Sequence, residues 1–216
     1  MLARQNAVRY AGMRQRFGGE DSVRSDADED EAALLRAEVR RLSAELSGAQ
    51  KRIAELEARA DVDPLLDILN RRGFERELAR GISHVARYAT PTALMFIDLD
   101  GFKAVNDRHG HSAGDALLKA VAAELTAHVR ASDVVGRLGG DEFGLLMWHV
   151  DPPLAEGKAR DLERLIERLA VPHSGAALSV GASAGIAPLA AGVSPAALID
   201  AADKAMYVRK RTRRGG

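Results

Sequence analysis

The stretch Phe96–Leu118, FIDLDGFKAVNDRHGHSAGDALL, runs from an apolar strand through a polar loop into a helix. The strand begins upstream, at Thr92, and carries no charge before the carboxylate of Asp98 at its end, which is typical of a buried strand. Further along, Gly139–Phe143 reads GGDEF, and its two glycines suit a tight turn between two strands. These two stretches decide the fold, because the first marks a strand that ends at a carboxylate and the second marks a turn between strands that carries two more.

The rest of the second half alternates between helical and strand-like patterns. The order β-α-β-β-α-β predicts an α+β fold, a split βαβ sheet with helices on one face. In such a sheet the first and third strands are neighbours, so Asp98 should face the turn that carries Asp141 and Glu142. We expect a helix at Arg71–Tyr88, a strand at Thr92–Asp98, a helix at Ser112–Arg130, strands at Asp133–Leu138 and Glu142–Trp148, a helix at Leu154–Ala170, a strand at Ala177–Ala187 and a helix at Pro195–Lys210.

Carboxylates converge in this arrangement without a matching cluster of Lys or Arg in the motif. Asp98, Asp100, Asp141 and Glu142 would lie together, and burying like charges is costly unless a cation lies between them. Hard oxygen ligands beside a phosphate substrate indicate Mg²⁺. A Gly-Gly-Asp turn alone, however, is a commonplace hairpin.

A nucleotide could be held between the first strand and the following helix. We expect a short loop at Gly101-Phe102-Lys103, whose backbone N–H groups and Lys103 ammonium could hold phosphate oxygens. Asp115 could accept hydrogen bonds from the N1–H and exocyclic amine of guanine, whereas adenine has no N1–H donor; Asn106 can both donate and accept. Taken alone, Lys103 would be a surface lysine, and Asn106 and Asp115 would be helix caps.

Together these motifs resemble the GGDEF family of diguanylate cyclases, from about Asp63 to Arg214. Besides GGDEF itself, Phe96–Leu118 and the block Ala202–Tyr207 match the family pattern. The resemblance implies a cyclase/polymerase-palm-like domain that condenses two GTP to cyclic di-GMP and two pyrophosphates across a homodimer. It implies catalytic roles for Asp141, Glu142 and Lys103; two Mg²⁺, with Mn²⁺ as a substitute, on Asp98, the Leu99 carbonyl and Asp141; and substrate binding by Phe102, Lys103, Asn106, His111, Asp115, Gly139, Gly140, Lys210 and Arg214.

A second binding site is implied upstream of the GGDEF turn. Arg130-Ala131-Ser132-Asp133 has the form RxxD and matches the site at which this family binds its product as an inhibitor. A guanidinium fork suits phosphate and guanine, and a carboxylate suits the guanine edge. By itself RxxD is most often a solvated helix end.

Two blocks depart from the family pattern. In Asp63–Arg72, DPLLDILNRR, the residues Leu66, Asp67 and Leu69 replace the usual Thr, Gly and Pro. At the other end, Lys210–Gly215 reads KRTRRG and lacks the usual Gly and Asn. The expected metal and guanine positions are unaltered.

The N-terminal part predicts a dimerisation helix. Residues 1–31 read as a flexible lead that is acidic at its end, residues 32–62 as a parallel coiled coil, and residues 63–216 as the GGDEF domain. Two heptad series carry the coil, with β-branched Val39 and Ile53 at a positions and leucine at d. The alternative is one amphipathic helix packed on its own domain. The heptad positions are Ala32, Val39, Leu46, Ile53 and Ala60 at a, and Leu35, Leu42, Ala49 and Leu56 at d.

Composition excludes several other classes. The chain has 216 residues with 31 basic and 31 acidic side chains, so net charge gives no reason to expect nucleic-acid binding. It has no cysteine, which excludes disulfides, thiolate catalysis and cysteine zinc sites. No secretory signal or membrane span is visible, so we expect a cytoplasmic protein. Two other functions stay open: an inactive GGDEF domain that is a receptor for GTP or cyclic di-GMP, and a coiled-coil dimeriser with an inert domain.

Overall fold

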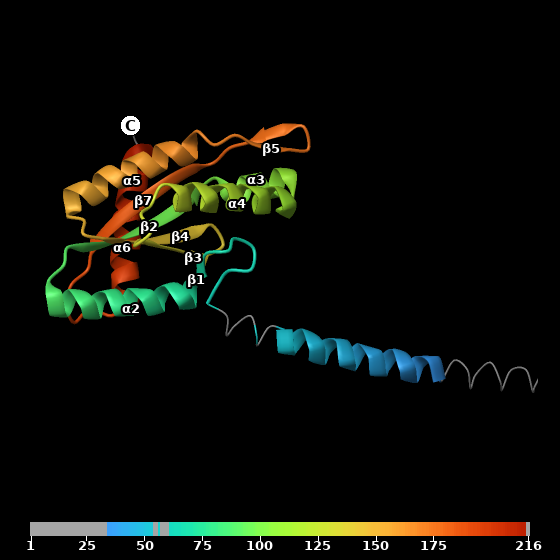
Figure 1. The fold of residues 1–216 in the computed structure, drawn as a ribbon. Coiled ribbons are helices and arrows are strands. Elements are labelled where there is room, and N and C mark those ends of the chain that lie inside the picture. Colours follow the sequence, from blue (N-terminus) through green and yellow to red (C-terminus); the bar gives the residue numbers. More distant parts are fainter. Residues whose placement is uncertain (1–33, 54–55, 57–60, 215–216) are drawn as a thin grey trace, which may run out of the picture. The chain divides into compact units, whose positions relative to one another are not determined.

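The computed structural model describes residues 34–53, residue 56 and residues 61–214, with side chains as far as Arg211 (Figure 1). Contacts divide the chain into two units, Met1–Ala58 and Arg59–Gly216. The predicted flexible lead, residues 1–31, lies outside the described residues, as do residues 32–33, 54–55 and 57–60 of the predicted coil. The last two residues of that coil, Asp61 and Val62, are described and are not helical, because Val62 forms a bridge with Leu69 instead. Among the described residues, no helix is long and apolar enough to cross a bilayer.

The N-terminal unit contains a helix over residues 34–53, as the heptads predict. Its exposed face carries ion pairs of helical spacing, in which Arg41 contacts Glu38 at 2.6 Å and Glu45 at 2.8 Å. The heptad leucines are uncovered in the single chain: Leu35, Leu42 and Leu46 are 60%, 50% and 61% exposed. The helix is therefore formed as expected, whereas its pairing with a second copy stays a prediction.

The second unit is built on a five-stranded sheet in the order β1-β3-β4-β2-β7. Strand β2 pairs antiparallel with both β4 and β7, and β3 pairs antiparallel with β4. The short strand β1 lies parallel to β3. The expected neighbours, the first and third predicted strands, are β2 and β4. The strands are β1 (Leu69–Asn70), β2 (Thr92–Asp100), β3 (Val134–Gly139), β4 (Glu142–Trp148) and β7 (Gly181–Pro188).

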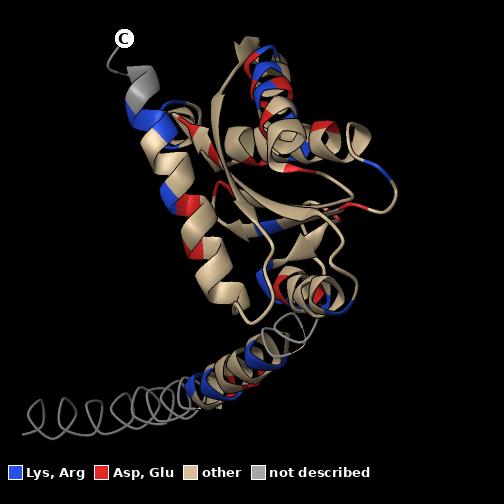
Figure 2. Cartoon of the chain, turned by 90° about the vertical axis from the view of Figure 1, so that its left-hand side faces the viewer, with Lys and Arg blue, Asp and Glu red and all other residues tan. Residues whose placement is uncertain are grey.

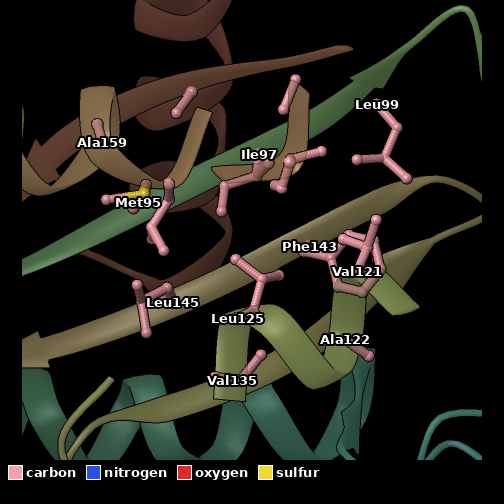
Figure 3. Packing of buried hydrophobic residues seen from close by; sticks show 14 of the residues in the cluster. Met95, Ile97, Leu99, Val121, Ala122, Leu125, Val135, Phe143, Leu145 and Ala159 are labelled. Carbon is pink, nitrogen blue, oxygen red and sulfur yellow. The ribbon is translucent and has the colours of Figure 1, made fainter. Parts of the chain in front are cut away.

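Helices cover both faces of this sheet, so the expectation of helices on one face is wrong (Figure 1). The reason lies in β2, whose side chains from Ala93 to Ile97 are all apolar and point alternately to opposite faces. Leu94 and Phe96 pack with α2 (Arg71–Tyr88) and α6 (Pro195–Arg214). Met95 and Ile97 pack with α4 (His111–Ala127) and α5 (Pro152–Glu167), as Figure 3 shows.

Besides the short strand β1, which the sequence pattern did not predict, two segments differ from the expected elements. The loop expected after Asp100 is the first turn of a helix, α3 (Phe102–His109), which follows Gly101 in a left-handed conformation with φ 86°. The strand expected at Ala177–Ala187 is divided between β7 and a separate hairpin of β5 (Val171–His173) and β6 (Ala176–Leu178). The hydrophobic pattern predicted neither the helix after Asp100 nor the separation of β6 from β7, because apolar runs do not show where a chain turns away from a sheet.

Candidate active site

Carboxylates from β2 and from the β3–β4 turn meet at one end of the sheet. Asp98 lies opposite Glu142 in the register of β2 and β4. The Leu99 N–H donates to the carbonyl of Asp141 at 3.2 Å, which fixes the turn against the end of β2. Asp98, Leu99, Asp141 and Glu142 thus come together although up to 44 positions separate them in the sequence.

Burial and mutual repulsion disfavour the charged forms of these acids. Burial raises the pKa of Asp141, and the negative charge of Asp98 raises it further. Burial also raises the pKa of Glu142, whereas the nearby Arg71 guanidinium partly opposes this shift. The site therefore favours a cation beside Asp98 and Asp141.

One cation is already present, on α6. The Lys210 ammonium contacts a carboxylate oxygen of Asp98 and lies 2.8 Å from one of Asp100. Burial lowers the pKa of Lys210, but the hydrogen bonds to Asp100 and Asp98 outweigh it and the net shift is upward. The other oxygen of Asp100 accepts a hydrogen bond from the Ser183 hydroxyl at 2.7 Å. Lys210, predicted as a phosphate ligand, is thus a partner of the carboxylates in this structure.

The donor set suits Mg²⁺. Asp98, the Leu99 carbonyl and Asp141 offer hard oxygens, and the repulsion between the two carboxylates is what a divalent cation would relieve. Residues 34–53, 56 and 61–214 contain no group of three or more His, Cys, Asp or Glu side chains arranged for a metal. A partial set still fits, because protein-bound Mg²⁺ usually keeps waters and takes substrate phosphates as further ligands.

The expected guanine ligands lie on α3 and α4. The Oδ1 atom of Asn106 is buried and has no hydrogen-bond partner among the described residues. It lies so close to Gly114 that a Cβ there would be 2.0 Å from it. His111 and Asp115 are exposed in the first turns of α4. The structure thus leaves Asn106 with an acceptor that a bound donor could use.

The expected phosphate ligands begin α3. Phe102 is buried under this helix, while Lys103 is exposed in its first turn. The free backbone N–H groups of a first helical turn attract anions, so a helix supports this role better than the expected loop. Arg214 is the last residue of α6, and the structure describes only its backbone.

Two arginines that the sequence reasoning missed hold the GGDEF turn. Arg137 donates twice to the Gly140 carbonyl, at 2.8 and 3.1 Å, and contacts Asp63 at 3.1 Å. Arg71 donates to the Leu138 carbonyl at 2.5 Å and lies 3.6 Å from Glu142. The position of Arg137, two residues before Gly139, was the one available signal for its role.

The glycines of the turn have different surroundings. A Cβ on Gly139 would lie 2.6 Å from a carboxylate oxygen of Glu142, whereas one on Gly140 would meet nothing within 4 Å. A side chain at position 139 would therefore displace the carboxylate end of Glu142, and Gly140 supplies the carbonyl that Arg137 binds.

The RxxD segment forms a closed turn before β3. The two oxygens of the Asp133 carboxylate accept from the backbone N–H groups of Arg130 at 3.0 Å and Trp148 at 3.2 Å. The Arg130 side chain is exposed, between cavities of about 330 and 550 Å³ that both include Arg130 and Asp133. Asp133 thus has a structural role here, and product binding at this site stays a prediction.

Comparisons with known proteins agree with this geometry. The family model described as diguanylate cyclase, GGDEF domain, matches residues 60–216. Diguanylate cyclase TpbB from Pseudomonas aeruginosa is 40% identical over 169 residues, which cover 75% of this chain and 38% of that protein. The chain therefore spans less than half of this curated relative.

Solved structures share the fold. A sensory box/GGDEF family protein from Caulobacter crescentus is 38% identical, with a TM-score of 0.67 over 71% of this chain and 99% of that chain. The GGDEF domain of DgcB from Caulobacter crescentus, solved in complex with c-di-GMP, is 25% identical, with a TM-score of 0.67 over 71% of this chain and 91% of that chain.

Proposed function

Because the chain belongs to the GGDEF family of diguanylate cyclases, we propose that residues 63–216 condense two molecules of GTP into cyclic di-GMP. Each 3′-hydroxyl oxygen forms a bond to the α-phosphorus of the opposite nucleotide, the bond to pyrophosphate breaks, and the hydroxyl proton passes to solvent. The meeting of Asp98, Asp141 and Glu142 at one end of the sheet carries this proposal.

The protein part of the metal site is Asp98, the Leu99 carbonyl and Asp141. When bound there, Mg²⁺ supplies charge neutralisation of the phosphates and makes the 3′-hydroxyl more acidic. Glu142 supports this site from the opposite strand, and the Arg71 guanidinium 3.6 Å away balances its charge. Arg137 holds the turn in place through the Gly140 carbonyl.

The nucleotide is bound by α3 and α4. Lys103 and the first-turn N–H groups of α3 hold phosphate oxygens, and Lys210 adds a second ammonium beside them. Asp115 accepts from the guanine edge and the buried Oδ1 of Asn106 accepts from a further base donor. Phe102, His111, Gly139, Gly140 and Arg214 complete the proposed substrate site.

Catalysis takes place between two copies of the chain, since each copy brings one GTP. The exposed apolar heptads of the N-terminal helix supply the seam of a parallel coiled-coil homodimer. The product, cyclic di-GMP, binds in turn at Arg130 and Asp133 and inhibits the enzyme. The exposed guanidinium of Arg130, between two cavities, supports this second site.

The test is to incubate the purified chain with GTP and Mg²⁺ and to identify the product by mass. We expect cyclic di-GMP from the unaltered chain and a loss of about 10³ in rate in Asp141→Asn, which corresponds to about 4 kcal/mol of lost transition-state stabilisation. Asp107→Asn, an exposed aspartate of α3, is the matched control and should keep the full rate. Binding of GTP or cyclic di-GMP without turnover would instead identify a receptor, and neither binding nor turnover would identify an inert domain.

A further inference from the structure

Arg209, the residue before Lys210 on α6, is also held by carboxylates, but by those of helix α5. The Arg209 guanidinium contacts a carboxylate oxygen of Glu156 and lies 3.1 Å from one of Glu163, both on α5. Helices α5 and α6 cover opposite faces of the sheet, so these ion pairs pass around its edge at β7. Figure 2 shows the charged residues gathered toward the C-terminal end of α6.

Of the two glutamates that bind Arg209, Glu163 is the more buried. Its side chain is 7% exposed, and its other oxygen accepts the Ala184 N–H of β7 at 2.9 Å. A carboxylate buried to this degree needs a cation partner, because an unpaired buried charge costs several kcal/mol. Arg209 is that cation, so one carboxylate joins α5, β7 and α6.

The same turns of α6 are also pressed against β7. A Cβ on Gly185 would lie 2.1 Å from the Met206 backbone nitrogen and 2.2 Å from the Ala202 carbonyl, so helix and strand approach at backbone distance. Met206 is buried and lies three residues before Arg209. The end of α6 is therefore held at two points, the Met206 contact and the Arg209 ion pairs.

Lys210 follows directly and is the residue that these contacts orient. Neighbouring residues on an α-helix point about 100° apart, so a guanidinium fixed on α5 sets the direction of the next side chain. That direction brings the Lys210 ammonium to Asp98 and Asp100. Without the ion pairs on α5, the last turns of α6 would fray, as helix ends commonly do.

We propose that Arg209 is a positioning residue, whose ion pairs with Glu156 and Glu163 hold the end of α6 so that Lys210 reaches the carboxylates of the candidate active site. The inference rests on the proposed function only for its effect on turnover. Among the described side chains, the ion pairs of the Arg209 guanidinium are with Glu156 and Glu163 rather than with the carboxylates of that site, so Arg209 acts through Lys210.

A double-mutant cycle in turnover tests whether Arg209 acts through Lys210. Arg209→Met should lower kcat/KM for GTP about tenfold, the size of one charge-assisted contact, while Lys210→Met lowers it at least as far. The double variant should be no worse than Lys210→Met alone, because the positioned group is already absent. Arg211→Met, which removes the next and exposed cation of α6, should keep the parent value.

Two more conservative substitutions, Glu163→Gln and Arg209→Lys, test the same inference if Arg209→Met does not fold. Glu163→Gln retains an oxygen for the Ala184 N–H but loses the charge that binds Arg209, so it should share the loss in kcat/KM. Arg209→Lys keeps the charge but not the fork that spans two carboxylates, and should recover part of the loss. Additive effects in the cycle, or an Arg209→Met variant indistinguishable from Arg211→Met, would overturn the inference.

A readout without substrate separates this inference from the proposed function. In a ¹⁵N spectrum of the lysine ammonium groups at one fixed pH, the bound Lys210 should give a slowly exchanging signal, assigned by its loss in Lys210→Met. The signal should disappear in Arg209→Met and remain in Arg211→Met. A chain that shows this pattern but never converts GTP would refute the cyclase activity and support the positioning role. A chain that converts GTP while Arg209→Met keeps the signal would refute the positioning role alone.

Discussion

A single buried oxygen, Oδ1 of Asn106, connects the packing of α3 against α4 to the proposed recognition of guanine. It has no hydrogen-bond partner among the described residues, and a buried acceptor without a donor costs about 1–3 kcal/mol. Gly114 leaves room for Asn106 in this position, because any side chain at residue 114 would occupy the same space. At the scale of the residue, the proposed base site thus depends on a glycine at position 114, where even the methyl group of an alanine would displace Asn106.

Gly114→Ala should therefore weaken GTP binding by about tenfold or more, since the added Cβ displaces Asn106 and also approaches Phe102 at 3.1 Å. The measurement is titration with a GTP analogue that cannot react. Gly157→Ala on α5 is the matched control, because its Cβ would meet only Arg160, at 4.0 Å. That control should leave the affinity unchanged and stabilise the helix by about 1 kcal/mol. Equal affinities of the parent and Gly114→Ala would contradict the placement of the base.

At the scale of the element, the turn at Asp63–Ile68 replaces a usual glycine by Asp67. Its backbone is left-handed, with φ 55°, and its N–H donates to the Asp63 carbonyl at 3.1 Å. Asp63 in turn caps Leu65 and Leu66 and contacts Arg137, so the turn is linked to the GGDEF hairpin. The departure from the family pattern is thus accommodated by strain at one residue.

Relief of that strain should stabilise the domain. Asp67→Gly should raise the free energy of unfolding by about 0.5–1 kcal/mol, because glycine adopts positive φ without steric cost and loses only part of this gain in chain entropy. Denaturant unfolding measures the change. Ala89→Gly, at the other end of α2 with φ 52°, should shift stability in the same direction. A destabilised Asp67→Gly would mean that the carboxylate, rather than the backbone, matters at this turn.

Product inhibition at the RxxD turn is better tested by a substitution of Arg130 than by one of Asp133. Asp133→Ala would remove the acceptor of two backbone N–H groups and destabilise the chain, whereas Arg130→Ala keeps the backbone bond and removes only the exposed guanidinium. Arg130→Ala should therefore raise the concentration of cyclic di-GMP needed for half-inhibition, by about tenfold for one bidentate contact, with little change in stability. Inhibition curves for this variant and for Arg87→Ala, an exposed arginine at the end of α2, provide the comparison. Superimposable inhibition curves would show that the RxxD segment is only a structural turn and not a binding site for cyclic di-GMP.

At the scale of the whole molecule, the proposed reaction requires two active sites to meet, and the N-terminal helix is the element that would bring them together. Linking two domains raises the effective concentration of one for the other. Leu42, at a d position, is 50% exposed in the single chain and would be buried in a coiled coil.

Leu42→Asp should shift the chain toward monomer, since a buried charge in the seam costs several kcal/mol. Specific activity should fall steeply at low protein concentration and recover in part at high concentration. Leu34→Asp is the matched control, because Leu34 lies outside the a and d positions and is 72% exposed. Sedimentation and activity across a dilution series measure both. A monomeric Leu42→Asp variant with unchanged specific activity would show that the coil does not assemble the enzyme.

The sequence alone determined the elements whose signals are local. The apolar run before Asp98, the glycines before Asp141 and the periodicity of α2 and α4 predicted those strands and helices, and with them the meeting of Asp98 and Glu142. Heptad spacing likewise predicted the N-terminal helix over its described part. These features were accessible because hydrophobic periodicity and turn chemistry are properties of neighbouring residues.

Only the tertiary structure decided how the helices cover the sheet and which cation pairs with which distant carboxylate. Helices cover both faces of the sheet because β2 is apolar on both sides, and α3 replaces an expected loop. Arg137 on Asp63, Lys210 on Asp98 and Arg209 on Glu163 join residues that are 74, 112 and 46 positions apart. No periodicity marks such pairs, since a long cationic side chain finds its carboxylate only after the elements that carry both have packed.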